Sequence, residues 1–292
     1  ATVNAGTNVK VDGDLDANAG TVDITAGELL NITGALDIAS GAKVNVNGDT
    51  VDVGGAVNVN GDVVHGTNGG ALNFVSAATE ITAQSLAVTG DYSTTAGTGG
   101  MWTLTGGAQI DGGVNVADNS LLNFNVGGAI GTGAVNNNGT AIFNATDAIR
   151  VGGDISNAGT LTFTSAEISL TGNLINTDAA KEMRLNTENG AIAFGTLTNT
   201  SGAMVLHAAN GIEFESIVSN AGELTLDSGA GIINITDAGL TVGDTSTITL
   251  VGAGLDLNGD FNVANTTLYQ NYVGTLSDGM INVASDDYTV SA

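Results

Sequence analysis

The side chains that could support acid–base or metal chemistry are few and scattered along the chain. Glu213 and Glu215 alternate along a predicted strand, so both would point to one face about 7 Å apart, as paired catalytic carboxylates can. The basic cluster lies at residues 181–184, and neither His65 nor His207 has a His or Cys neighbour in sequence. These groups are more simply explained as structural or solvated side chains, and there is no nucleophile motif or phosphate-binding loop. We therefore expect no enzymatic activity.

Calcium is the one metal for which the sequence offers candidate ligands. Asp12, Asp14 and Asp16 form an alternating acidic run, and hard carboxylate oxygens suit calcium. Neither an EF-hand loop nor a nine-residue Gly/Asp calcium repeat occurs, however. We expect no cofactor and keep calcium at these three aspartates as the alternative.

Composition and charge exclude several classes of function. The 292 residues carry 30 Asp and Glu against five Lys and Arg, a net charge of −25, which is incompatible with binding nucleic acid or an anionic membrane surface. The absence of cysteine excludes zinc fingers, disulfide scaffolds and thiol enzymes. The sequence contains no run of 18 apolar residues, which is the length that would predict a membrane-spanning helix. An enzyme acting on acidic polysaccharides would need more basic residues than Arg150, Lys181 and Arg184.

Short strands dominate the hydrophobic pattern. Apolar–polar–apolar triplets such as Leu36–Ile38, Val57–Val59 and Leu161–Phe163 recur, separated by Gly, Asn and Asp. This period of two predicts half-buried strands, and no stretch sustains helical spacing beyond residues 177–183.

The strands repeat about every 20 residues in three columns. One column starts at Leu122 and another at Ile149, and the members of a third are Val135, Ile155, Leu174, Leu197, Ile217 and Leu240. A polar column accompanies them, because asparagines that precede similar turns recur at steps of 19 to 23 residues. Stacked asparagines can hydrogen-bond along a β-structure, and we expect such a ladder at Asn138, Asn157, Asn176, Asn199 and Asn220.

These repeats predict an all-β fold, a right-handed parallel β-helix (β-solenoid) of about 12–14 coils of about 20 residues with three short strands per coil. The absence of proline fits, because each interior strand must donate its N–H groups to a ladder. We expect one domain over residues 1–292 with an insertion loop at residues 177–183, where the repeat steps lengthen. The least regular stretch is expected at residues 87–113.

Three repeats carry a family resemblance. Residues 153–163 (GDISNAGTLTF), 166–176 (AEISLTGNLIN) and 220–226 (NAGELTL) resemble the passengers of filamentous haemagglutinin-type and autotransporter adhesins. The resemblance covers roughly residues 114–270 and implies a β-helical bacterial protein that is secreted or displayed on the cell surface. The secretion motif of the haemagglutinin type contains proline and is absent from this sequence.

The two ends of the sequence bear on location and assembly. A chain that starts at Ala1 favours a removed signal peptide and hence secretion. Three of the four tyrosines, Tyr269, Tyr272 and Tyr288, lie close to the C-terminus, and residues 285–292, including Val290, have strand character. Such a tail could pair with another copy by strand addition or fold back to cover its own solenoid, and the sequence leaves both open.

We expect an extracellular structural protein, a β-solenoid subunit that self-assembles end to end into a filament or surface matrix such as that of a biofilm. The alternative is an adhesin passenger that binds glycans or host surface proteins. The expected partners are other copies of the chain and, in the alternative, glycans or cell-surface components, without nucleic acid or membrane insertion.

Overall fold

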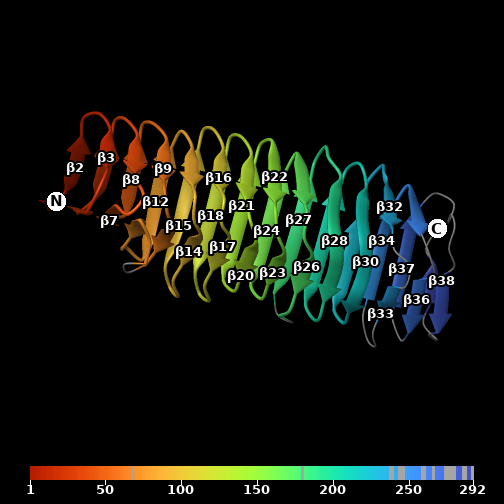
Figure 1. The fold of residues 1–292 in the computed structure, drawn as a ribbon. Coiled ribbons are helices and arrows are strands. Elements are labelled where there is room, and N and C mark those ends of the chain that lie inside the picture. Colours follow the sequence, from red (N-terminus) through yellow and green to blue (C-terminus); the bar gives the residue numbers. More distant parts are fainter. Residues whose placement is uncertain are drawn as a thin grey trace. The chain divides into compact units, whose positions relative to one another are not determined.

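The chain forms a β-solenoid, as the repeats predict. The computed structural model describes residues 1–66, 69–178, 181–236, 240–242, 247–257, 261–264, 267–272, 281–284 and 288–290. It is 62% strand, with no helix among these residues, in about 11 turns of about 21 residues each (Figure 1). The chain divides into two compact units, Ala1–Asp147 and Ala148–Ala292.

Three ladders of parallel strands run through the first unit, and each coil contributes one strand to each ladder. Their members, in spatial order, are as follows. Ladder I contains β1 (Thr2–Ala5), β4 (Thr21–Ala26), β7 (Lys43–Asn47), β11 (Leu72–Phe74), β10 (Val63–His65), β14 (Tyr92–Thr94), β17 (Val114–Val116) and β20 (Val135–Asn137). Ladder II contains β2 (Asn8–Val11), β5 (Leu29–Ile32), β8 (Thr50–Val53), β12 (Ala78–Ala83), β15 (Gly99–Leu104), β18 (Leu121–Val126) and β21 (Thr140–Ala145). Ladder III contains β3 (Leu15–Ala17), β6 (Leu36–Ile38), β9 (Val57–Val59), β13 (Leu86–Val88), β16 (Ala108–Ile110) and β19 (Ile130–Thr132).

The second unit repeats this arrangement. Its ladder II contains β24 (Thr160–Ser165), β27 (Glu182–Thr187), β29 (Ala203–Ala208), β31 (Glu223–Asp227), β34 (Thr247–Gly252), β37 (Thr267–Tyr272) and β39 (Tyr288–Val290). The remaining strands are β22 (Ala148–Val151), β23 (Ile155–Asn157), β25 (Glu167–Leu170), β26 (Leu174–Asn176), β28 (Ile192–Asn199), β30 (Ile212–Asn220), β32 (Ile232–Ile235), β33 (Leu240–Val242), β35 (Gly254–Leu257), β36 (Phe261–Ala264) and β38 (Ile281–Ala284). The long strand β28 pairs with both β25 and β26, because it continues through a corner that separates these two strands in the preceding coil, and the long strand β30 pairs with β28.

In-register apolar side chains form the core. Alternate residues of each strand point inward, so the partner of an inward residue in the next coil is also inward. Phe124 packs on Phe143 at a ring distance of 5.6 Å, and Phe194 on Phe214 at 4.9 Å with nearly parallel rings. The repeat columns expected within residues 148–236 are confirmed by the strand registers. Each coil therefore buries its apolar face only by stacking on its neighbours.

One coil of the first unit carries an additional strand in ladder I. β11 pairs with β7 on one side and with β10 on the other, and β10 then pairs with β14. In ladder II, β12 pairs directly with both β8 and β15. From β7 to β14, ladder I therefore contains four strands, whereas the matching part of ladder II, from β8 to β15, contains three. The additional strand lies in the 29-residue step from Val63 to its partner Tyr92.

The irregular regions differ from expectation in two places. Residues 87–113, expected to be the least regular, form the ordinary strands β13 to β16, and the irregularity lies earlier, at β10 and β11. The insertion expected at residues 177–183 is shorter, because Glu182 and Met183 belong to β27 and Met183 is completely buried. No membrane-spanning helix occurs among the residues that the structure describes.

Candidate functional site

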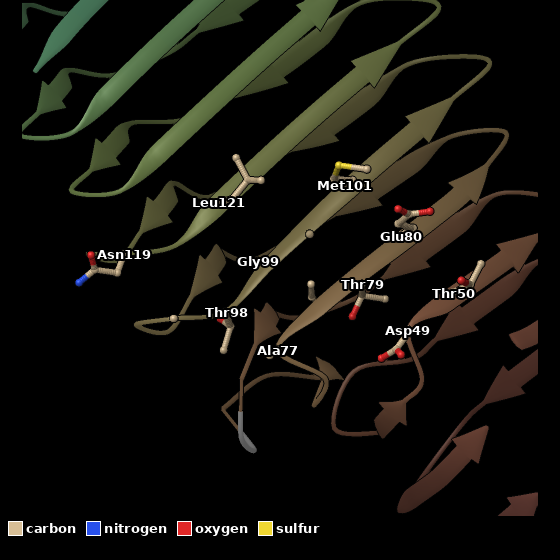
Figure 2. A pocket seen from close by; sticks show the side chains of 13 residues that line it. Asp49, Thr50, Ala77, Thr79, Glu80, Thr98, Gly99, Met101, Asn119 and Leu121 are labelled. Carbon is tan, nitrogen blue, oxygen red and sulfur yellow. The ribbon is translucent and has the colours of Figure 1, made fainter. Parts of the chain in front are cut away.

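An open groove on the outer face of ladder II is the candidate site in the first unit. Its volume is about 610 Å³, and it crosses β8, β12, β15 and β18 near the start of each strand (Figure 2). It is lined by Asp49, Thr50, Ala77, Ala78, Thr79, Glu80, Gly97, Thr98, Gly99, Gly100, Met101, Asn119 and Leu121. The volume falls in the range of about 300–1,000 Å³ that is usual for ligand sites.

The groove forms where small residues replace large side chains on the outer face of the ladder. Ala78 and Gly99 are strand partners, and Leu121 follows them in the next coil, so a small residue and a glycine precede a large one in the same outward column. A Cβ added to Gly99 would lie 2.1 Å from the carbonyl oxygen of Leu121, which leaves no room for a side chain there. Met101 and Leu121 remain 38% and 42% exposed and form an apolar side of the groove.

The other side of the groove is acidic. The exposed carboxylates of Asp49 and Glu80 form no hydrogen bond or ion pair among the described residues, and no basic side chain lines the groove. Further along the same two strands, Thr82 instead donates a hydrogen bond to Asp52. Asp49 and Glu80 are therefore free to meet an external donor.

A buried polar cluster lies directly beneath the glycine floor. A Cβ on Gly100 would lie 2.4 Å from two atoms of the His65 imidazole, so the ring packs where that side chain would be. His65 stacks on Phe74 of the additional strand at 4.7 Å. Its Nε2 lies 2.5 Å from the Tyr92 hydroxyl, which also accepts a hydrogen bond from Trp102 Nε1 at 2.5 Å. All four side chains are at most 1% exposed.

The donor pattern identifies the protonation state of this cluster. The indole N–H of Trp102 can only donate, so the Tyr92 oxygen accepts it and the Tyr92 O–H donates to His65 Nε2. His65 is therefore neutral with its proton on Nδ1, and that atom has no well-aligned hydrogen-bond partner among the described residues. Burial lowers the pKa of His65 from 6.5 to about 3, an effect that the Gly99 backbone opposes. Burial also raises the pKa of Tyr92, with the Trp102 hydrogen bond opposing the shift.

An asparagine ladder runs through the second unit. Asn157 Nδ2 donates to Asn176 Oδ1 at 2.9 Å, Asn176 to Asn199 at 3.0 Å, and Asn199 to Asn220 at 2.8 Å. All four side chains are completely buried. The same amides also donate to backbone carbonyls at the corner, for example Asn157 to Gly159 at 2.7 Å. The ladder therefore holds successive corners in register inside the core.

The expected ladder residue in the first unit was wrong by one position. Asn138 is exposed, whereas Asn137 is 1% exposed and donates to the carbonyl of Gly139 at 3.3 Å. Val135 faces inward, and the period of two places Asn137 on the same side of β20. Because residues 136–138 are all asparagine, the sequence alone does not show which of the three points into the core.

The candidate calcium ligands have separate roles in the structure. Asp12 forms an exposed ion pair with Lys10, and Asp14 accepts the backbone N–H of Ala35 at 2.7 Å. Asp16 lies beside Asp37 of the next coil. Among the described residues there is no group of three or more His, Cys, Asp or Glu side chains that could hold a metal ion.

The other residues singled out from the sequence are dispersed. Glu213 and Glu215 point outward from β30, and Asn234 donates to Glu213 at 3.2 Å. Arg184 pairs with Glu182 at 2.6 Å on the surface. The Nδ1 atom of His207 lies 2.8 Å from the Oδ2 atom of Asp227 on the neighbouring strand. Each of these contacts joins residues of adjacent coils or of one strand, and none brings the expected groups together into a shared site.

The C-terminal residues proposed for self-association lie in strands of the chain's own solenoid. Tyr269 and Tyr272 belong to β37, and Tyr288 and Val290 belong to β39. β39 pairs in parallel with β37, with Leu268 opposite Tyr288. The side chains of these four residues, and residues 285–287 and 291–292 of the expected tail, lie outside what the structure describes.

Sequence reasoning missed the groove and the polar cluster. The signal for the cluster was present as a coil of unusual length, next to a concentration of aromatic residues. Its steps, such as Val63 to Tyr92, span 28 to 30 residues, whereas the expected repeat is near 20. No protein-family model, no curated protein and no solved structure matches this chain. Function must therefore be inferred from the geometry.

Proposed function

We propose that this protein is an extracellular structural subunit whose solenoid stacks end to end on other copies to build a filament or a surface matrix. The observation that carries the proposal is the one-sided pairing of the first coil. Within the described residues β1, β2 and β3 each pair along one edge only, with β4, β5 and β6. Three parallel strands thus offer unpaired N–H and C=O groups to a further coil.

An incoming copy would continue the arrangement that every interior coil already makes. β39 is the last described strand of ladder II, and β38 is the last described strand of the set β33–β36–β38. Pairing of β39 with β2 of the next copy would extend ladder II from one copy to the next. A contact of this kind joins different surfaces and does not close, so it generates a filament.

The charge and the sequence pattern support an extracellular role. The net charge of −25 would keep filaments soluble and apart, and divalent cations could bundle them. The repeats at residues 153–163 and 166–176 resemble those of adhesin passengers that bacteria secrete or display. Secretion or display at the cell surface is part of the proposal.

Negative-stain electron microscopy of an Asn4→Pro variant tests the stacking contact. The carbonyls of Ala1 and Ala5 accept N–H groups from the β4 side, at Asp23 and Gly27, so the N–H of Asn4 points toward the unpaired edge. Proline there removes one donor to an incoming strand and leaves the pairing with β4 intact. We expect filaments from the parent chain and from Asn4→Ala, and short particles from Asn4→Pro. Dispersed particles from the parent chain at high concentration would refute the proposal.

A second function, an adhesin-like surface protein that binds a partner, is favoured by the groove over β12 and β15. Its free carboxylates and exposed Met101 and Leu121 form the kind of mixed surface that a ligand would cover. Binding of glycans or host surface proteins to a monomeric chain would support this function. It does not depend on filament formation, and the two can be tested separately.

A further inference from the structure

The groove over β12 and β15 has one acidic side and one aliphatic side, and this combination defines the ligand that fits it. Figure 2 shows Asp49 just before β8 and Glu80 on β12, with Met101 and Leu121 on the next strands. We propose that the groove binds a lysine-bearing segment of a partner polypeptide. This inference rests on the second function proposed above and not on filament formation.

Charge selects a cationic occupant. Residues 1–147 contain twelve aspartates and two glutamates against Lys10 and Lys43, so the groove lies in a strongly negative field. Glu28, directly before β5, is a further exposed carboxylate on the neighbouring coil. An anionic ligand would be repelled, and an ammonium group would meet carboxylates that have no internal partner.

Shape selects a cation with an apolar stem. Lysine carries an ammonium group on four methylenes, and such side chains cover apolar surface while the charged end stays at a polar site. With Met101 and Leu121 under the stem, the ammonium group reaches the side of the groove that carries Asp49 and Glu80. The lining contains no aromatic ring on which a sugar could stack.

A second copy of this chain is a poor occupant. The whole sequence has five Lys and Arg. Lys10 is paired with Asp12 and Arg184 with Glu182. The partner is therefore a different, basic polypeptide.

Binding of a labelled peptide to the Asn4→Pro chain tests the proposal without interference from filaments. The probe is acetyl-Leu-Lys-Ala-Lys-Leu-amide, and the comparison peptide has glutamine in place of both lysines. We expect the lysine peptide to bind with an affinity that falls at least tenfold in Asp49→Asn/Glu80→Gln. The matched control, Asp16→Asn/Asp147→Asn, removes two exposed carboxylates elsewhere in the unit and should change the affinity less than twofold.

Methionine methyl NMR places the peptide on the molecule. The Met101 methyl group lies in the groove, whereas Met183 and Met204 are completely buried in the second unit. We expect the peptide to shift the Met101 resonance and to leave those of Met183 and Met204 unchanged; Met280, the fourth methionine, is replaced by leucine in the sample to keep the assignment unambiguous. The proposal is overturned if the lysine peptide does not bind, if the glutamine peptide binds equally well, or if both double variants lose affinity equally. A neutral tetrasaccharide that displaces the peptide and shifts Met101 more strongly would also overturn it, in favour of a glycan site.

Discussion

Acidification should destabilise this protein through one buried imidazole. His65 is completely buried, and its Nε2 accepts a hydrogen bond from the Tyr92 hydroxyl. In the unfolded chain the imidazole has an ordinary pKa of 6.5, whereas burial lowers the folded value to about 3. Between these values the unfolded state binds a proton that the folded state rejects, so stability falls as pH decreases through this window and is fully present above it.

The size of the effect follows from the two pKa values of His65. One pKa unit corresponds to about 1.4 kcal/mol, so the drop from 6.5 to about 3 lowers the unfolding free energy by about 4 kcal/mol at pH 3 and by up to about 5 kcal/mol at lower pH. At pH 5 the loss is about 2 kcal/mol. The chain also carries 30 Asp and Glu residues, so a single pH profile cannot isolate the contribution of the histidine.

The difference between the parent and His65→Phe does isolate it. Phenylalanine keeps the ring stack on Phe74 and cannot be protonated, but it leaves the Tyr92 O–H without an acceptor, at a cost of about 1–3 kcal/mol at every pH. We therefore expect His65→Phe to be less stable at pH 7, equal to the parent near pH 5, and more stable at pH 4. Urea unfolding at each pH measures these values.

A control and a contrary result complete the test. Tyr92→Phe removes the hydroxyl but keeps the buried histidine, so its stability should still fall as the pH decreases below 6.5, unlike that of His65→Phe. A constant difference between His65→Phe and the parent from pH 7 to pH 4 would show that the imidazole is solvated in the folded state.

Two further predictions concern packing within each unit, and urea unfolding also measures them. Asn176→Ala removes the middle of a buried ladder and should cost about 2–4 kcal/mol, because amide groups on both neighbouring coils lose their partner. The exposed Asn136→Ala should change stability by less than about 0.5 kcal/mol, and equal losses would mean that the ladder is hydrated. Gly100→Ala places a Cβ 2.4 Å from the His65 ring and should cost about 1–3 kcal/mol. Gly6→Ala meets no atom within 4 Å and should be neutral or slightly stabilising, so a comparable loss there would contradict the packing argument.

The fold could be predicted because the strand register of a solenoid appears in the sequence as a regular repeat. In a stacked coil, residues one period apart occupy the same column, so Ile168, Ile192 and Ile212 pair directly, as their spacing predicts. The hydrogen bond between the buried Asn157 and Asn176 could be predicted for the same reason, because a turn that repeats must be capped in the same way in each coil.

The additional strand could not be predicted from periodicity. β11 interrupts the repeat, because Val63 pairs with Leu72 only nine positions further along the chain. A period search treats this short step as a loop, whereas the chain forms a second strand of the same ladder there, at Leu72–Phe74. The glycine- and threonine-rich sequence around Trp102 was expected to be irregular for a related reason. Its glycines, Gly99 and Gly100, make room for Leu121 and His65 of other strands, which only the three-dimensional packing reveals.

The groove was also beyond sequence reasoning. Its outline depends on which outward columns lack a side chain, and Ala78 and Gly99 become neighbours only through a 21-residue register. The carboxylates of Asp49 and Glu80 are unremarkable in a chain with 30 acidic residues. Their distinction is the absence of an internal partner among the described residues, which a sequence cannot show.

The strand β11 has the character of an edge dislocation in a crystal. One layer is inserted on one side of a regular stack and ends inside it, as an extra half-plane of atoms ends within a lattice. The mismatch is concentrated at the line where the layer stops, which here runs through the rings of His65, Phe74 and Trp102. Coils on either side of such a line are each periodic, but their phases differ. Insertions and deletions of about nine residues should therefore be tolerated at this line, whereas elsewhere only changes by a whole coil preserve the stack.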